Sequence, residues 1–297
     1  MLISCLASAK NYRIPAGVSE IGDNAFENCR SLTSVEIPDG VSEIGRNTFK
    51  NCRSLTSVKI PKGVRYIRSN VFKNCTSLTS VTIPNSVVNI SQTAFLGCTA
   101  LKEWSISFAN SSYARDGVAL LTKNGERIVA CLASAKKYQI PECVTEIGDY
   151  TFSGCSSLTS VEIPDSVTEI GENAFSGCRS LTSIAIPASV KKIGDSAFAD
   201  CSSLTSVNIP EGITYIRNDA FSGCSSLKSV TISDGVAVIY NRTFKNCSSL
   251  TSVILPKSVT SIYSDAFDNC PKLTIYAPKG SYAQIFAREH KIPFQVK

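Results

Sequence analysis

The sequence predicts a solenoid, a fold in which copies of one short unit stack on each other and share a continuous core. A cysteine recurs every 23 residues in two series, from Cys29 to Cys98 and from Cys155 to Cys270, and apolar residues keep fixed places around it. A fixed period of this length is the signature of a repeat array. The 297 residues are 43% hydrophobic, enough to build a core, but no apolar run approaches the ~18 residues that a membrane span needs.

Each unit contains two short extended pieces and a turn. Residues 41–63 read VSEIGRNTFKNCRSLTSVKIPKG. The alternation in Val58-Lys-Ile60 is typical of a short strand, and Val64-Arg-Tyr-Ile67 forms a second extended piece. Phe72 lies in an Asn-rich segment that favours a tight turn or one helical turn. One unit has too few apolar residues for a core of its own, so the units must stack. The ten units begin at Val18, Val41, Val64, Val87, Val144, Val167, Val190, Ile213, Val236 and Val259.

The pattern LxxVxIPxxVxxIxxxxFxxC resembles the leucine-rich repeats of the BspA-like (Treponema pallidum-type) family. It recurs ten times and covers nearly the whole chain. The resemblance implies a right-handed, curved leucine-rich-repeat solenoid with short parallel strands, in a cell-surface or secreted protein of adhesion type. The departures are local: Trp104 takes the place of the strand valine, and Ser107 and Ser233 replace the proline.

The array is interrupted once and closed at its C-terminal end. Apolar stretches on both sides of Asn124-Gly125, the strongest short-range hairpin signal, predict a two-stranded β-hairpin insert. Residues 1–10 repeat residues 127–136, so we infer that the sequence begins on the second strand of such a hairpin and is a piece of a longer protein. Ser281 is a suitable N-cap for a helix with Tyr282, Ile285, Phe286 and Glu289 on one face, which predicts a C-terminal cap.

These features divide the chain into five parts of one continuous solenoid domain. They are a partial hairpin (1–17), repeats one to four (18–109), the hairpin insert (110–143), repeats five to ten (144–278) and the cap (279–297).

The 13 cysteines and the single histidine, His290, are the residues to consider for metal binding and catalysis. Metal sites need paired cysteines or additional histidines, and no such spacing exists, so we expect no metal and no cofactor. No nucleophile–base pair or carboxylate pair stands out from the repeat background, so we expect no catalytic residues. The ten laddered cysteines share one position, where a small buried thiol fits better than a disulfide. Cys143 lies outside this ladder.

Candidate binding residues lie where the second extended piece points away from the core. The residues just before and after its isoleucine should face outward, and glycine is the usual second residue. Tyrosine and arginine, the types most enriched in binding hot spots, replace the usual residues in a few repeats. Stacking of aromatic rings between neighbouring repeats is an alternative and compatible role. The predicted partner-binding residues are Tyr66, Arg68, Tyr215, Arg217, Tyr240 and Tyr263.

The charge is uneven along the chain. Residues 1–143 carry 17 Lys and Arg against 10 Asp and Glu, and no acid lies between Ile44 and Lys102. The sequence therefore predicts a basic patch that attracts an acidic partner or a sulfated glycan, although a charge run is often only a solvated face. No nucleic-acid motif accompanies the basic residues. The predicted patch consists of Arg46, Lys50, Arg53, Lys59, Lys62, Arg65 and Lys73.

The function predicted from these features is non-catalytic binding. We expect a monomeric module of a cell-surface or secreted protein that adheres to a protein or glycan of a host or neighbouring cell. The alternative is a structural spacer within a longer multidomain protein. We expect no nucleic-acid partner and no membrane span.

Overall fold

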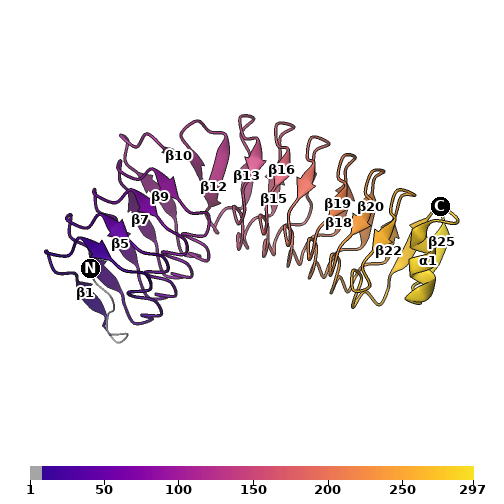
Figure 1. Ribbon diagram of the computed structural model, residues 1–297, viewed down its shortest axis with the longest axis horizontal. Coiled ribbons are helices and arrows are strands. Elements are labelled where there is room, and N and C mark those ends of the chain that lie inside the picture. The colour runs from indigo at the N-terminus through magenta and orange to yellow at the C-terminus, as the bar shows by residue number, and fades with distance from the viewer. Residues whose placement is uncertain (1–8) are drawn as a thin grey trace. The chain divides into compact units, whose positions relative to one another are not determined.

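The computed structural model describes residues 9–297 and forms two compact units, Met1–Ala135 and Lys136–Lys297 (Figure 1). Both are stacks of short parallel strands, as the 23-residue period predicts. The hairpin strand expected within residues 1–8 lies outside the described residues. No helix among residues 9–297 is long and apolar enough to cross a bilayer.

In the first unit, each repeat contributes one strand to a five-stranded parallel sheet and one two-residue strand on a second face. The first set is β1 (Asn11–Arg13), β3 (Ser34–Glu36), β5 (Ser57–Lys59), β7 (Ser80–Ile83) and β9 (Glu103–Ile106). The second set is β2 (Glu20–Ile21), β4 (Glu43–Ile44), β6 (Tyr66–Ile67) and β8 (Asn89–Ile90). The strands pair in register, for example Val58 with Val81 and Ile67 with Ile90, so the inward-facing columns hold apolar residues.

The insert in the first unit has three antiparallel strands, β10 (Tyr113–Asp116), β11 (Ala119–Thr122) and β12 (Arg127–Cys131). The sequence predicts only two. The additional strand, β10, pairs Tyr113 with Thr122. Asn110 holds the start of β10 against the preceding repeat. Its side-chain amide donates to the carbonyls of Pro84 and Val87, and its Oδ1 atom accepts from the Tyr113 amide.

The second unit repeats the design and ends in a helix and a strand. Its first set is β13 (Lys137–Gln139), β15 (Ser160–Glu162), β18 (Ser206–Ile209), β20 (Ser229–Ile232), β22 (Ser252–Ile254) and β24 (Thr274–Ala277). Its second set is β14 (Glu146–Ile147), β16 (Glu169–Ile170), β17 (Lys192–Ile193), β19 (Tyr215–Ile216), β21 (Val238–Ile239) and β23 (Ser261–Ile262). The last two elements are α1 (Tyr282–Glu289) and β25 (Phe294–Val296), which pairs in parallel with β24.

The core of each unit is a column of stacked phenylalanines with an aromatic side chain at each end. In the first unit, Phe26 to Phe95 stack with ring centroids 5.1 to 5.6 Å apart. Tyr12 meets the first ring edge-on and Trp104 meets the last. In the second unit, Phe152 to Phe267 stack at 4.9 to 5.5 Å. This column ends on Tyr138 and, through an edge contact, on Phe286 of α1.

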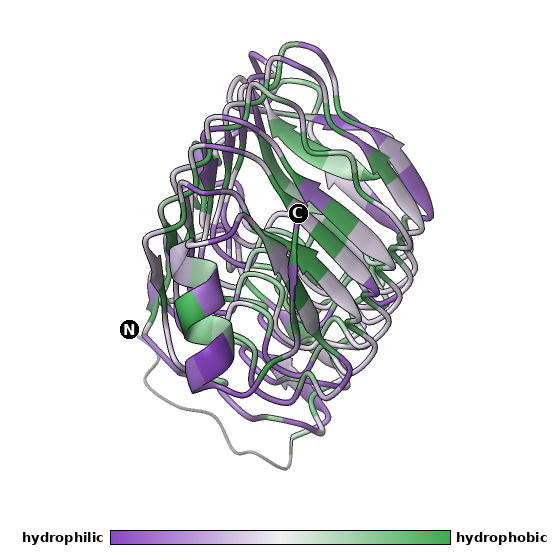
Figure 2. Ribbon diagram, turned by 90° about the vertical axis from the view of Figure 1, so that its right-hand side faces the viewer, coloured by the Kyte–Doolittle hydropathy of each residue, from purple (hydrophilic) through white to green (hydrophobic). Residues whose placement is uncertain are grey.

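Helix α1 packs through only part of the predicted face. Tyr282 and Ile285 are exposed, and the buried side chains are Ala283, Phe286 and Ala287. Phe286 takes this place because its ring contacts Phe267 of the last repeat. Ser281 is at the N-cap position, but its side chain makes no capping hydrogen bond. Hydrophobic and hydrophilic residues alternate along the helix in the hydropathy colouring of the ribbon (Figure 2).

The turns between the strands require a left-handed backbone, which explains their Asn and Gly residues. Asn24, Asn47 and Asn70 share one such position, with φ of 56° to 61°. The side-chain amides of Asn47 and Asn70 each donate to the asparagine of the preceding repeat at 3.0 Å. Asparagine tolerates this conformation better than most residues. Asn28, Asn51 and Asn74 form a second row of this kind, with donor–acceptor distances of 2.8 and 3.0 Å.

Close packing requires glycine at position 45, directly after the second-set isoleucine of its repeat. A Cβ atom at Gly45 would lie 2.5 Å from the Asp23 backbone nitrogen and 2.6 Å from its Oδ1 atom. This Oδ1 atom accepts a hydrogen bond from the amide of Arg46 at 2.6 Å. The glycine therefore lets the Asp23 side chain tie one repeat to the next.

We expect Gly45→Ala to lower the free energy of unfolding by about 1–3 kcal/mol, because the new methyl group displaces backbone atoms. Urea unfolding followed by circular dichroism measures this change. Gly17→Ala is the matched control, since nothing lies within 4 Å of a Cβ atom there. Equal stability of the two variants would contradict the packing argument.

Candidate binding surface

The outward residues of the second strand set form the candidate surface. Each strand of this set buries its isoleucine and exposes at least part of the preceding side chain, as β6 and β19 do with Tyr66 and Tyr215. In the first unit, this face is hollowed over Gly22 and Gly45. The hollow has a volume of about 430 Å³, and its lining includes Glu20, Asp23, Glu43, Arg46 and Arg68.

Four of the six predicted partner-binding residues come together in the second unit. We call Tyr215, Arg217, Tyr240 and Tyr263 the contact strip. The Tyr215 and Tyr240 rings meet edge-to-face at a centroid distance of 6.2 Å, and Tyr240 stacks on Tyr263 at 5.2 Å. Tyr215 is 47% exposed and Tyr263 41%. The stacking expected between repeats and the exposure expected of a contact surface therefore occur together.

Arg217 is exposed within this strip, and no ion pair joins it to any residue in the range 9–297. Two acidic residues, one in the preceding repeat and one two positions after Arg217, have other partners. Asp195 accepts a hydrogen bond from the Asn218 amide at 3.1 Å. Asp219 is held by Arg242 in a bidentate pair, with Nε–Oδ1 and Nη2–Oδ2 distances of 2.9 and 2.8 Å. The positive charge of Arg217 is thus left facing solvent.

The other two predicted residues, Tyr66 and Arg68, lie together in the first unit. Arg68 contacts the carboxylate of Glu43 at 3.3 Å, and its guanidinium carbon lies 5.9 Å from the Tyr66 ring centroid, within cation–π range. Tyr66 is 48% exposed. Arg68 therefore has both a carboxylate and an aromatic partner within its own unit.

The predicted basic patch is dispersed around the repeats. Lys59 ends β5 in the first strand set, whereas Arg65 and Arg68 flank β6 in the second, and these sets belong to different sheets. Lys50 is half-buried and paired with Glu27 at 2.9 Å. The absence of acids between Ile44 and Lys102 thus does not make the region uniformly basic, because stacking brings acids from the preceding repeat. The exposed members are Arg46, Arg53, Lys59, Lys62 and Arg65, whereas Lys73 is half-buried.

The laddered cysteines form hydrogen bonds that join neighbouring repeats in the core. Each thiol from Cys52 to Cys98 donates to the carbonyl of the phenylalanine 26 residues earlier, at 3.0 to 3.1 Å. In the second unit the same bond recurs from Cys178 to Cys270 at 3.1 to 3.3 Å. Burial raises the pKa of Cys98 and of Cys201 to about 12, so both remain thiols at neutral pH. The twelve cysteines of residues 9–297 form no disulfides, and Cys143 is exposed.

Residues 9–297 contain no group of three or more potential metal ligands. Beside α1, a hollow of about 350 Å³ is lined by Cys270, His290 and Asp268 among others, but His290 stacks on Phe286 and its Nδ1 atom lies 3.0 Å from the Phe286 carbonyl oxygen. The ring is thus held against the core face of the cap.

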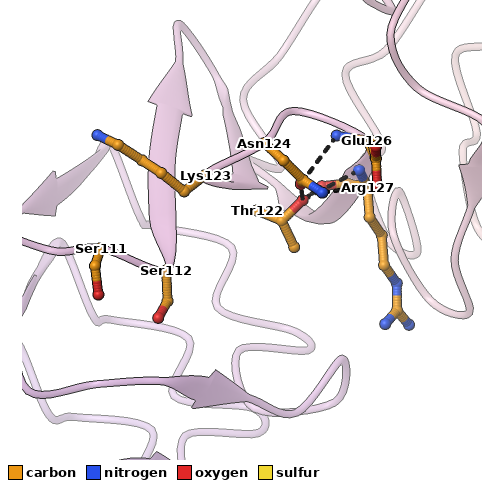
Figure 3. Close-up of a pocket in the computed structure, with 7 residues that line it drawn as sticks. All are labelled: Ser111, Ser112, Thr122, Lys123, Asn124, Glu126 and Arg127. Carbon is orange, nitrogen blue, oxygen red and sulfur yellow. Dashed lines mark hydrogen bonds between the residues drawn. The ribbon is translucent and has the colours of Figure 1, made fainter.

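Another hollow, of about 680 Å³, lies beside the β11–β12 turn (Figure 3). Its polar side chains bond to one another: Thr122 donates to Asn124, and Asn124 donates to Glu126, both at 2.7 Å. These bonds shape the turn, so the hollow presents no concentrated set of groups to a ligand.

The Arg242–Asp219 pair and the asparagine rows escaped the sequence analysis. Both join residues 23 positions apart, so aligning the repeats in columns and reading charges and amides down each column would have revealed them.

The chain was also compared with known proteins. The family described as "BspA type Leucine rich repeat region (6 copies)" matches residues 4–115, 125–241 and 215–287. No curated protein matches significantly.

Similar solved structures are bacterial repeat proteins. A leucine-rich repeat protein from Eubacterium ventriosum is 26% identical, with a TM-score of 0.81, over 89% of this chain and 77% of that one. A leucine rich cell surface protein from Faecalibacterium prausnitzii is 29% identical, with a TM-score of 0.60, over 93% and 80% of the two chains. The pneumococcal vaccine antigen PcpA, at 17% identity, shares the fold, with a TM-score of 0.78 over 97% and 79%. The protein belongs to the BspA-type leucine-rich-repeat family.

Proposed function

We propose that the chain is a non-catalytic, protein-binding module of a surface or secreted protein, and that it adheres through the contact strip. The observation that carries this proposal is the run of three tyrosine rings beside an unpaired arginine on one sheet face. Exposed aromatic and arginine side chains gathered on a rigid support are typical of binding hot spots. The surface location is supported by the likeness to the Faecalibacterium prausnitzii cell surface protein. The matched family is a repeat family, not a catalytic one.

A glycan partner remains the second candidate, favoured by the same aromatic rings, and a spacer role is the alternative without a partner. The hollows of about 350 and 590 Å³ in the second unit have other linings than the strip. A strip on an open sheet face suits a protein surface better than a small sugar, which binds best in a concave site.

The test replaces Tyr215, Arg217, Tyr240 and Tyr263 together with Ser. We expect binding to a panel of extracellular-matrix proteins to fall about a hundredfold or more, because several hot-spot side chains are lost at once. Surface plasmon resonance gives the affinities, a glycan array examines the second candidate, and circular dichroism checks the fold.

The matched control is Asn208→Ser with Thr231→Ser, which alters exposed residues of β18 and β20 in the other strand set. Undiminished binding by the strip variant would refute the proposed surface. A wild-type chain that binds neither panel would support the spacer role.

A further inference from the structure

The sequence Tyr-Ile-Arg occurs twice, at residues 66–68 and 215–217, in equivalent places of two repeats. In both, the isoleucine is buried, and the tyrosine is nearly half exposed, at 48% for Tyr66 and 47% for Tyr215. The two sites share a backbone setting, because each tyrosine and isoleucine form a two-residue strand of the second set. Differences in charge between them therefore come from neighbouring side chains.

The decisive neighbour lies 25 residues before each arginine. In the first unit it is Glu43, whose carboxylate pairs with Arg68 at 3.3 Å. In the second unit it is Lys192, whose ammonium group is instead paired with Glu169 of the preceding repeat. One residue thus determines whether the arginine is neutralised by its own chain.

We infer that Arg217 is the anion-binding centre of the contact strip and that the partner is a protein that presents an acidic segment. This inference rests on the proposed function. Arg217 is exposed, the residue 25 positions before it is Lys192 and not a carboxylate, and Asp195 and Asp219 are held by other groups. Carboxylates bind arginine in a charge-assisted, often bidentate pair.

The ring geometry favours an acidic peptide over a sugar. Tyr240 lies between Tyr215 and Tyr263, and its ring stacks on Tyr263 with an interplanar angle of 19°. The facing sides of these two rings are covered, whereas a sugar that stacks on an aromatic residue needs a free face. The phenol hydroxyl groups can donate hydrogen bonds to carboxylates.

The experiment exchanges the decisive neighbour between the two sites. Fluorescence anisotropy at low ionic strength measures binding of a labelled oligo-glutamate peptide. We expect Lys192→Glu to weaken binding about tenfold, because the new carboxylate neutralises Arg217 as Glu43 neutralises Arg68. We expect Glu43→Lys to add a second binding site and so to double the stoichiometry. Both variants copy an arrangement that the chain already contains.

Lys257→Glu is the matched control, since it makes the same charge change at an exposed lysine outside the strip. Equal weakening by Lys192→Glu and Lys257→Glu would mean that net charge alone acts, and it would overturn the inference. Unchanged stoichiometry in Glu43→Lys would overturn it as well. Tighter binding of hyaluronan than of oligo-glutamate would reassign the site to an acidic glycan.

These outcomes are distinct from failure of the proposed function. If the fourfold strip variant keeps its affinity for matrix proteins, the proposed function fails whatever the peptide result. If that variant loses affinity while Lys192→Glu binds the peptide normally, the strip stands and the role of Arg217 is wrong.

Discussion

Replacing Phe175 with alanine is expected to lower the free energy of unfolding by about 3–5 kcal/mol. Phe175 is fully buried and stacks between Phe152 at 4.9 Å and Phe198 at 5.2 Å, with both ring planes parallel to its own within 2°. Removing its ring leaves a cavity in the column and deprives both neighbours of a contact. In a solenoid each repeat contacts only its neighbours, so no distant packing offsets this loss.

Chemical denaturation followed by circular dichroism measures the effect. Phe108→Ala is the matched control, because the Phe108 side chain is fully exposed. The control should change the free energy of unfolding by less than about 0.5 kcal/mol. A loss below about 1 kcal/mol in Phe175→Ala would show that the stacked rings do not hold the repeats together.

The second large effect is a loss of stability in alkali. Burial raises the pKa of Cys98 and Cys201 from 9.0 in the unfolded chain to about 12 in the folded one. Below pH 9 both states hold the proton, and stability does not depend on these thiols. Between pH 9 and 12 the unfolded state releases the proton while the folded state keeps it, so stability falls as pH rises. Each thiol contributes about 1.4 kcal/mol per pH unit, or about 3 kcal/mol for the pair at pH 10.

Urea unfolding at pH 8 and pH 10, with a reductant present, measures this dependence. The double variant Cys98→Ala with Cys201→Ala should lose markedly less stability between the two pH values than the original chain does. Cys143→Ala provides the comparison, since this residue is exposed and outside the ladder. An identical pH dependence in all three proteins would contradict the raised thiol pKa values.

The repeat architecture could be predicted because residues that stack in one column of the structure recur every 23 residues in the sequence. A residue and its counterpart in the next repeat pair directly, as Val207 and Val230 do. The contact strip followed from the same period together with the alternation of inward and outward residues. Tyr240 and Tyr263 are therefore adjacent in space, as their spacing predicts.

What escaped prediction depends on which side chains pair with each other within a column. The ion pair of Lys50 with Glu27, 23 residues earlier, removes a charge from the expected basic patch, and only a reading of the charges down this column reveals it. The direction in which α1 packs was predicted only in part. Its sequence offers two apolar faces, and only the position of Phe267 selects the face with Ala283 and Phe286.

The aromatic residues at the ends of each phenylalanine column have a consequence for how such proteins change in length. Tyr12 and Trp104 close one column edge-on, and Tyr138 and Phe286 close the other. Between these end residues, each phenylalanine ring stacks face to face on the ring of the next repeat. A unit of 23 residues inserted or deleted there presents the same phenylalanine ring above and below, so the ring contacts on both sides are preserved. Repeat number can thus vary by duplication or recombination while the closing residues stay in place, and the spacing between distant surface residues changes in steps of one repeat.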